Sequence, residues 1–313
     1  MVNVSIWVWV LFAVLLIAAI AFDLGLLRRS ARQHRELTVR AATLRSAAWI
    51  GLALLFGLVV MALYGPGAGV TYLTAYLLEE SLSIDNIFVF VLIFSELRIP
   101  APQQRGVLLW GVLGALVARG LLIGAGLFVL NRFHWVVYPF AALIIFAAVR
   151  LLWGQRVQRE VVVEACSVCS TWVARLIPIS PVFHGNRFLV RQGGRVLATP
   201  LFVALVIVET TDIVFALDSV PAVLAITRDP FLVYTSNIFA MLGLRSLYFV
   251  LAGAVERFRY LRVGLAVILI FFGARLLLSE VIEFPNHLSL AMIAVALGLS
   301  VAASIKWPGA KPA

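Results

Sequence analysis

The segment EESLSIDNIFVF, residues 79–90, decides the fold because it places three acids inside an apolar run that covers residues 71–95. The acids are Glu79, Glu80 and Asp85. An acidic side chain at the centre of a membrane helix costs about 2.5–3.5 kcal/mol on insertion scales, and such residues mark ion pathways or paired sites. The segment belongs either to a functional membrane helix or to an unusually apolar soluble core, and the rest of the chain separates the two.

The composition favours the membrane. Of 313 residues, 63% are hydrophobic and 13% are charged, with a mean hydropathy of +1.05. Soluble domains carry about 25% charged residues. A soluble protein of this composition would lack the polar shell that its surface requires. We therefore predict an all-α polytopic membrane protein.

Apolar windows of about 20 residues, the length of a helix that crosses a bilayer, predict nine transmembrane spans. They are 4–27, 46–64, 71–95, 106–130, 134–153, 197–226, 232–254, 261–281 and 287–305. The first span is not read as a signal peptide. It lacks a basic start, its apolar run is too long, and Arg28 and Arg29 follow it.

Positive charge predicts the orientation of these spans. Basic residues follow the first, third, fifth and seventh spans and occupy the C-terminal tail. They are Arg28, Arg29, Arg32, Arg35, Arg40, Arg45, Arg98, Arg105, Arg156, Arg159, Arg175, Arg187, Arg191, Arg195, Arg257, Arg259, Arg262, Lys306 and Lys311. The alternate connections hold Arg132 and Arg228. Because basic residues stay in the cytoplasm, we expect the N-terminus outside the plasma (inner) membrane and the C-terminus inside the cell.

This topology also accounts for the net charge of +10. Arginines beside membrane spans meet anionic lipid headgroups, so the bilayer is the expected partner. A nucleic-acid partner is not expected, because the chain has no soluble domain that could present a basic face. Oligomeric partners do not follow from the sequence.

The apolar region carries more acids than bases. Seven of the fifteen Asp and Glu residues lie inside predicted spans and more than three residues from their ends: Asp23, Glu79, Glu80, Asp85, Glu209, Asp212 and Asp218. Three arginines lie there: Arg119, Arg245 and Arg275. Structural ion pairs alone would need balanced numbers. The excess of carboxylates therefore predicts a cation site or a proton relay.

A second segment, VETTDIVFALDSVPAV at residues 208–223, repeats the pattern of the first. The aligned pairs are Glu79 with Asp212, Asp85 with Asp218, Asn86 with Ser219, Arg119 with Arg245, and, shifted by one residue, IFAAVRLL (145–152) with FFGARLLL (271–278). Each copy contains three spans, so the second copy enters the membrane from the opposite side. Secondary transporters use such inverted repeats and bind their cargo near the midplane.

The repeat divides one membrane domain, residues 1–313, into five parts. They are an N-terminal helix pair (1–70), the first repeat (71–153), a cytoplasmic connection (154–196), the second repeat (197–282), and the last helix with its cytoplasmic tail (283–313).

Helical geometry predicts which oxygens converge. Glu79 and Asn86 are seven residues apart, so their side chains project about 20° from one another. Asp212 and Ser219 have the same spacing. The acids just before Asn86 and Ser219 point about 100° away from these lines, so one straight helix cannot aim every oxygen at one ion. Pro221 leaves the carbonyl four residues earlier without a donor, and we expect a helix break there.

The donor types select the ion. Carboxylate, amide and hydroxyl oxygens suit Mn²⁺, Ca²⁺ or Mg²⁺, whereas zinc and copper favour imidazole and thiolate. Oxygen ligands do not separate Mn²⁺ from Ca²⁺. The two cysteines, Cys166 and Cys169, are too few for a closed zinc site and are expected to be reduced cytosolic thiols. No prosthetic group is expected.

These motifs resemble the TerC family of integral membrane proteins. The resemblance rests on EESLSIDNIF (79–88), ATPLFVALVIVETTDIVFALDSVPAV (198–223) and TSNIFAMLGLRSLYF (235–249), and it extends from about Asp23 to the eighth span. The family is named for tellurium resistance, and its alkali-induced bacterial branch is associated with manganese export. The resemblance implies metal-site positions at Glu79, Asp85, Asn86, Glu209, Asp212, Asp218 and Ser219, and Asp23 matches a further family position.

We therefore expect a secondary transporter, not an enzyme, that exports a divalent cation, Mn²⁺ first, in exchange for protons. The direction of transport follows from the resemblance. Arg119 and Arg245 are expected as counter-ions or gate parts, Asn237 as a cap or interhelical hydrogen-bonder, and Asp23 on the entry path. Two alternatives stay open: a tellurium-resistance protein that handles the oxyanion directly, and a membrane-assembly factor with structural acids.

Overall fold

In the computed structural model, the described residues are 4–32, 39–153, 155–252, 260–279 and 284–307, and side chains are described except at 22–32, 39, 155–159 and 161. These residues form ten α-helices, one 3-10 helix and one β-hairpin. The elements are α1 (Ile6–Arg32), α2 (Val39–Tyr64), α3 (Pro66–Glu96), α4 (Ala101–Arg132), η1 (His134–Val136), α5 (Val137–Leu152), α6 (Gln155–Leu176), β1 (Leu189–Gln192), β2 (Arg195–Ala198), α7 (Pro200–Leu224), α8 (Pro230–Leu251), α9 (Leu261–Leu277) and α10 (Asn286–Lys306).

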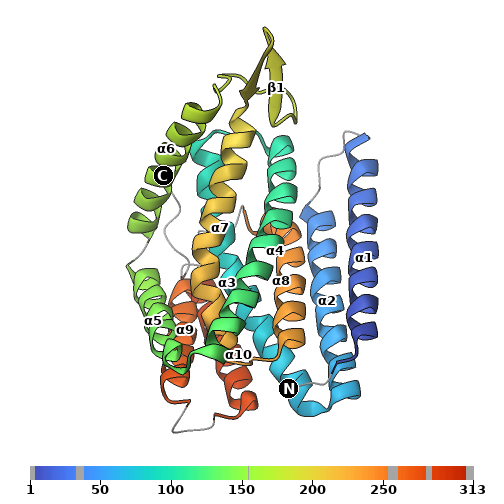
Figure 1. The fold of residues 1–313 in the computed structure, drawn as a ribbon, viewed down its shortest axis with the longest axis vertical. Coiled ribbons are helices and arrows are strands. Elements are labelled where there is room, and N and C mark those ends of the chain that lie inside the picture. The colour runs from blue at the N-terminus through green and yellow to red at the C-terminus, as the bar shows by residue number, and fades with distance from the viewer. Residues whose placement is uncertain (1–3, 33–38, 154, 253–259, 280–283, 308–313) are drawn as a thin grey trace.

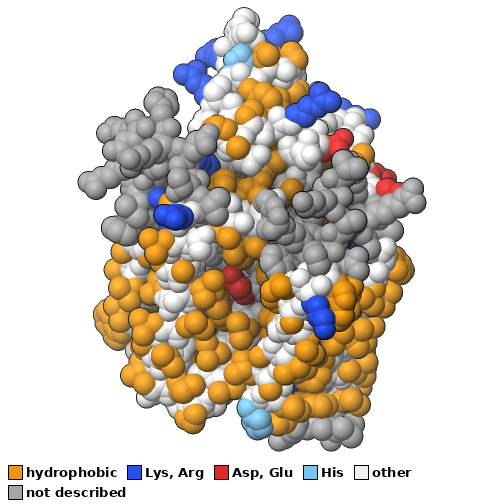
Figure 2. Space-filling view, turned by 180° about the vertical axis from the view of Figure 1, so that it is seen from behind, with side chains coloured by type: hydrophobic (Ala, Val, Ile, Leu, Met, Phe, Trp, Pro, Cys, Tyr) orange, Lys and Arg blue, Asp and Glu red, His pale blue; other side chains and the backbone are white. Residues whose placement is uncertain are grey.

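Nine of the ten helices coincide with the nine predicted spans, and α6 is the tenth. Within the described residues, five stretches are long and apolar enough to cross a membrane: Arg40–Tyr64, Ala101–Arg132, His134–Leu152, Pro200–Leu224 and Asn286–Lys306. Hydrophobic side chains cover most of the body of the molecule in Figure 2, while Lys and Arg gather toward one end. The prediction of an all-α polytopic membrane protein is confirmed.

The helices form one bundle in which the two acidic helices, α3 and α7, are central (Figure 1). α1 and α2 lie at one edge, and α5 and α9 lie at the other. α3 packs along α8, α4 along α7, and α5 along α9. A two-fold relation between α3–α5 and α7–α9 would exchange the first two pairs and preserve the third. The packing agrees with the predicted repeat, which remains a prediction.

Local sequence explains where the central helices begin. Proline occupies the first turn of α3, α4, α7 and α8, where its missing N–H is not needed and its fixed φ suits a helix. Asp229 caps α8, because its Oδ1 accepts hydrogen bonds from the backbone N–H groups of Phe231 (3.1 Å) and Leu232 (3.3 Å). These starts fix the helix ends and so the height of each side chain in the bundle.

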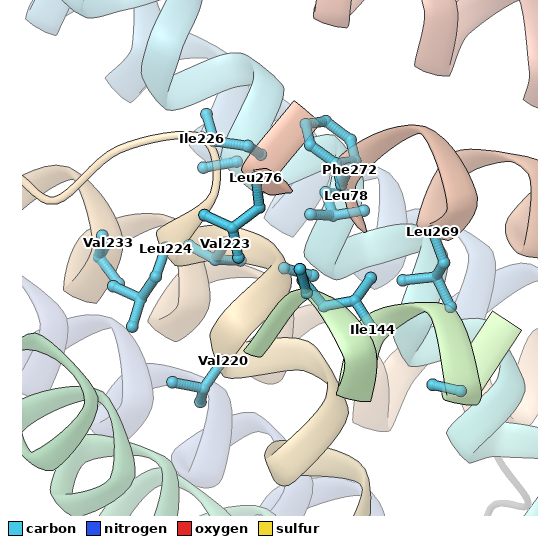
Figure 3. Close-up of a cluster of buried hydrophobic side chains, with 14 of the residues drawn as sticks. Leu78, Ile144, Val220, Val223, Leu224, Ile226, Val233, Leu269, Phe272 and Leu276 are labelled. Carbon is cyan, nitrogen blue, oxygen red and sulfur yellow. The ribbon is translucent and has the colours of Figure 1, made fainter. Parts of the chain in front are cut away.

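The described residues form three apolar cores, and two of them lie at different heights along α3, α4 and α7. One includes Leu78, Ile144, Val220, Leu269 and Phe272, drawn in Figure 3. The other lies nearer the β-hairpin. Its members include Ile87, Ala115, Val162, Val208 and Leu244. Along α3, α4 and α7 the chain passes from one core to the other, and a charged layer lies between them.

Two features of the structure differ from expectation. The connection 154–196 contains helix α6 and the antiparallel β1–β2 hairpin, which projects from one end of the bundle (Figure 1). The expected break at Pro221 is absent, because α7 continues through that residue to Leu224. A proline near a helix end removes only one hydrogen bond, and packing of the surrounding helix maintains the rest.

Candidate functional site

Arg119 on α4 links the acidic segments of α3 and α7. Its guanidinium donates to Glu79 Oε2 at 2.8 Å and to both oxygens of Asp212 at 3.2 and 3.3 Å. Nη1 also donates to Ser219 Oγ at 3.2 Å. All four side chains are buried. A single planar guanidinium, which donates along two of its edges, therefore bonds residues of both acidic motifs.

The charged layer follows from the spacing of the apolar residues. On α4, Arg119 lies between Ala115 of one core and Ile123 of the other. On α7, Asp212 lies between Val208 and Ala216 in the same way. Because each of these steps is about one helical turn, the polar residue faces the same direction as the apolar ones and is buried with them.

Two further ion pairs lie beside this cluster. Arg150 Nη2, near the end of α5, donates to Asp218 Oδ2 at 3.1 Å. Arg262 Nε, at the start of α9, lies 3.7 Å from Asp85 Oδ1. The Arg262 guanidinium also stacks over the Phe88 ring, 3.8 Å from its centre. The last acid of each motif thus has its own arginine.

A cavity of about 190 Å³ brings the two motifs together. Its polar lining includes Asp85 and Asn86 of α3, Arg119 of α4, Arg150 of α5, and Asp218 and Ser219 of α7. Its apolar lining includes Val162 and Ala165 of α6 and Leu265 and Leu269 of α9. The Asp–Asn and Asp–Ser pairs aligned from sequence therefore line one space. Glu79 and Asp212 do not line it, whereas Arg119 does.

The other predicted acids lie apart from this cavity. Glu209 packs against Gly114 of α4, where a Cβ would overlap its carboxylate. Glu80 lies beside Tyr76 on its own helix and beside Gly243 of α8. Neither Glu209 nor Glu80 belongs to the cavity wall. A ligand role for either one requires a different arrangement of the helices.

The remaining predicted residues have separate positions. Asn237 is buried on α8 beside Glu79. Arg245, also on α8, is partly buried. Pro221 is buried inside α7. Asp23 belongs to α1, and its side chain lies outside the described residues.

Sequence reasoning missed two of the arginines. Arg150 was not counted among the intramembrane bases, and Arg262 was counted only as a topological charge, yet both pair with motif aspartates. In the structure, the carboxylates of Glu79, Asp85, Asp212 and Asp218 face three guanidinium groups. The site therefore has a much smaller charge excess than the sequence indicated. The repeat, which includes IFAAVRLL, offered the one signal for Arg150.

Two buried amides lie beside the acids of this region. Asn237 hydrogen-bonds the Glu79 carboxylate, and Asn86 Nδ2 has no hydrogen-bond partner among the described residues. Burying a polar atom without a partner is costly. Among the described residues, however, no three Asp, Glu, His or Cys side chains form a ready-made metal site. The donors suit a hard cation, and their arrangement in this state does not enclose one.

Known proteins resemble this chain along most of its length. An uncharacterized membrane protein of Myxococcus xanthus is 47% identical over 297 residues, covering 95% of this chain and 91% of that protein. A protein of Escherichia coli K12, named as a candidate membrane-bound redox modulator, Alx, is 38% identical over 294 residues, covering 91% of this chain and 90% of that protein. No solved structure matches the chain significantly.

The family model described as the integral membrane protein TerC family matches residues 64–309. This range contains both acidic motifs, Arg119 and the cavity. The protein therefore belongs to the TerC family of integral membrane proteins.

Proposed function

We propose that the protein is a secondary transporter that exports a divalent metal cation, Mn²⁺ first, in exchange for protons. One observation carries the proposal: Asp85 and Asn86 of α3 share a cavity with Asp218 and Ser219 of α7. These residues are hard oxygen donors from two central helices. A midplane cavity between two helix repeats is where secondary transporters bind their cargo.

The chemistry of the wall supports the choice of cation. Among the described residues, the cavity lining contains neither His nor Cys, so soft metals and zinc have no favoured ligand there. Mn²⁺ and Ca²⁺ accept carboxylate, amide and hydroxyl oxygens, whereas Mg²⁺ gives up its waters reluctantly. The ion would take Asp85 and Asp218 as its anionic ligands. Arg150 and Arg262 would then have to release them.

Proton exchange follows from the same groups. A carboxylate must be deprotonated to bind a metal ion, so a proton can replace the metal when the cargo leaves. Protonated Asp85 and Asp218 would let the empty protein return without two partly buried negative charges. The direction of transport rests on the family association with manganese export.

The name of the Escherichia coli relative suggests a redox function as an alternative. The two cysteines of this chain give that alternative little support. Cys166 and Cys169 lie on α6, outside the candidate spans, and both are free. Burial, with smaller contributions from Glu96 and Cys169, raises the pKa of Cys166 to about 11. Because the thiolate is the reactive form, this environment suppresses thiol chemistry. Direct handling of a tellurium oxyanion has weaker support, since an acidic site repels anions.

Transport by purified protein in proteoliposomes tests the proposal. The full-length protein should carry Mn²⁺ across the membrane, with Ca²⁺ as the main competitor and Mg²⁺ and Zn²⁺ carried poorly. Asp85→Asn and Asp218→Asn should each reduce the initial rate at least about 10–100-fold, because each removes one anionic ligand. The double variant should be no worse than either single one, since one lost ligand already disables a shared site.

A matched control separates ligand loss from damage to the fold. Asp229→Asn makes the same chemical change at the α8 cap, where Asn also caps well, and should transport normally. Absence of Mn²⁺ transport by the wild-type protein would falsify the transporter proposal. Normal transport by well-folded Asp85→Asn or Asp218→Asn protein would remove these residues from the site.

A further inference from the structure

The position of Arg119 carries a further inference, which rests on the proposed function. The guanidinium lies between the cavity and the most deeply buried carboxylates. Arg119 lines the cavity, whereas Glu79 and Asp212 do not. A cation that enters the cavity therefore meets the Arg119 guanidinium before it can reach either of these acids.

Arg119 already uses the oxygens that a deep metal ion would need. It engages Glu79 Oε2 and both Asp212 oxygens. Of the four carboxylate oxygens, only Glu79 Oε1 is not engaged by Arg119, and Asn237 lies beside this carboxylate. A divalent ion bound by both carboxylates would take the same lone pairs and would lie against a second positive charge. The two cations cannot occupy this place together.

We propose that Arg119 is an internal cation that occupies the Glu79–Asp212 position in the absence of cargo and is displaced by the arriving metal. Its presence compensates two buried acids in the empty protein. Its displacement opens a deeper site formed by the Glu79 and Asp212 carboxylates. Arg119 is thus a specificity-determining residue, because a monovalent ion gains too little from the two carboxylates to replace a guanidinium bound along two edges.

If Arg119 and the metal ion compete for the same carboxylates, weakening Arg119 should raise the metal affinity and lower the transport rate. When a binding-competent state is only a small fraction of the population, the apparent dissociation constant rises by the inverse of that fraction. Weakening the bonds of residue 119 to Glu79 and Asp212 should therefore make metal binding tighter. It should also slow transport, because the internal cation no longer expels the metal efficiently.

Arg119→Lys is the test variant. Lysine keeps the positive charge that two buried acids need for folding, but its single ammonium cannot bridge both carboxylates along two edges. We expect equilibrium titration to show Mn²⁺ binding at least about tenfold tighter than in wild type, with a lower turnover in proteoliposomes. Arg275→Lys is the matched control, because Arg275 is also buried but bonds neutral oxygens, Ser289 Oγ and Asn286 Oδ1. The affinity of the Arg275→Lys variant for Mn²⁺ should equal that of the wild-type protein.

A measurement on the wild-type protein removes dependence on the variant. Mn²⁺ should increase modification of Arg119 by an arginine-specific dicarbonyl reagent, read by mass spectrometry, and should leave Arg275 unaffected. Unchanged or weaker metal affinity in folded Arg119→Lys, or protection of Arg119 by Mn²⁺, overturns the inference while the transport function stands. A wild-type protein that binds no Mn²⁺ overturns the proposed function itself.

Discussion

At the scale of single residues, the two aspartates of α7 differ in burial and in their arginine partners. On α7, the Asp212 side chain is 1% exposed and bonds a fully buried arginine, whereas Asp218 is 18% exposed and bonds Arg150, which is itself 37% exposed. Removing the charge of Asp218 leaves a cation that water can reach. Removing that of Asp212 leaves Arg119 with one buried partner fewer, at a cost of about 3–5 kcal/mol for a broken buried pair. Asp218→Asn is therefore the cleaner test of function.

Cys166 provides a prediction of pH dependence. Its pKa is raised from 9.0 to about 11, so its thiolate fraction at pH 8 is about a hundredfold below that of an ordinary thiol. In the Cys169→Ser variant, alkylation of Cys166 should be slow at pH 8 and should keep rising between pH 9 and pH 11. Mass spectrometry of timed iodoacetamide reactions measures this. A rate that is half-maximal near pH 9 and levels off above about pH 10 would show an unperturbed thiol.

Helical spacing predicted directions within a helix well and partners between helices poorly. The seven-residue step from Asp212 to Ser219 places both side chains at Arg119. Nothing local to α7 indicates that Asp218 pairs with Arg150, 68 residues away. Such pairs depend on the relative rotation and height of packed helices, which the sequence of one helix does not contain.

At the scale of helices, small residues set the distance between α5 and α9. A Cβ added at Gly273 of α9 would lie 2.6 Å from Ile145 Cγ1 and 3.4 Å from the Ala141 carbonyl oxygen, both on α5. Membrane helices associate through such close packing because they lack a hydrophobic driving force between them. Gly273→Ala should destabilise the protein by about 1–3 kcal/mol. Thermal unfolding in detergent measures the change.

Gly51→Ala is the matched control for this packing prediction. Gly51 lies inside α2, and a Cβ there has nothing within 4 Å. Since alanine favours a helix over glycine by about 1 kcal/mol, the control should be neutral or slightly stabilised. Equal unfolding temperatures for the two variants would contradict close α5–α9 packing.

Apolar length explains why some elements were predicted and others were not. The predicted span 197–226 and helix α7, Pro200–Leu224, agree within three residues at each end because apolar residues dominate both ends of the run. Helix α6 was missed because it is amphipathic and rich in charge, with Val162, Cys166 and Val173 on its buried side. Its amphipathic pattern was a signal, although a search for 20 apolar residues does not detect it.

At the scale of the whole molecule, the distribution of arginine predicts how the bundle is oriented across the membrane. In the described structure, Arg187, Arg191 and Arg195 lie on or beside the β-hairpin, and Figure 2 shows basic side chains gathered at that end. The opposite end has an almost entirely hydrophobic and uncharged surface in this view. Positive charge stays on the cytoplasmic side, so the hairpin is predicted to lie in the cytoplasm.

Cysteine accessibility tests this orientation in intact cells. In a Cys166→Ser/Cys169→Ser background, Val196→Cys places an exposed thiol on β2, and Asn131→Cys places one at the far end of α4. A membrane-impermeant maleimide should label Asn131→Cys in cells with a permeable outer barrier. It should label Val196→Cys only after the plasma membrane is opened. A reporter fused after Ala313 should be cytoplasmic in the same cells.

The orientation also constrains the proposed transport cycle. Helix α6 lies on the hairpin side of the bundle, and its Val162 and Ala165 form part of the cavity wall. If the hairpin is cytoplasmic, cargo for export approaches from the side that α6 covers, so α6 has to yield before the ion reaches Asp85 and Asp218. If Val196→Cys were labelled in intact cells, the hairpin would lie outside the cell and the orientation would be the opposite one. The same cavity would then open outward beneath α6, and the acids would face incoming rather than outgoing metal.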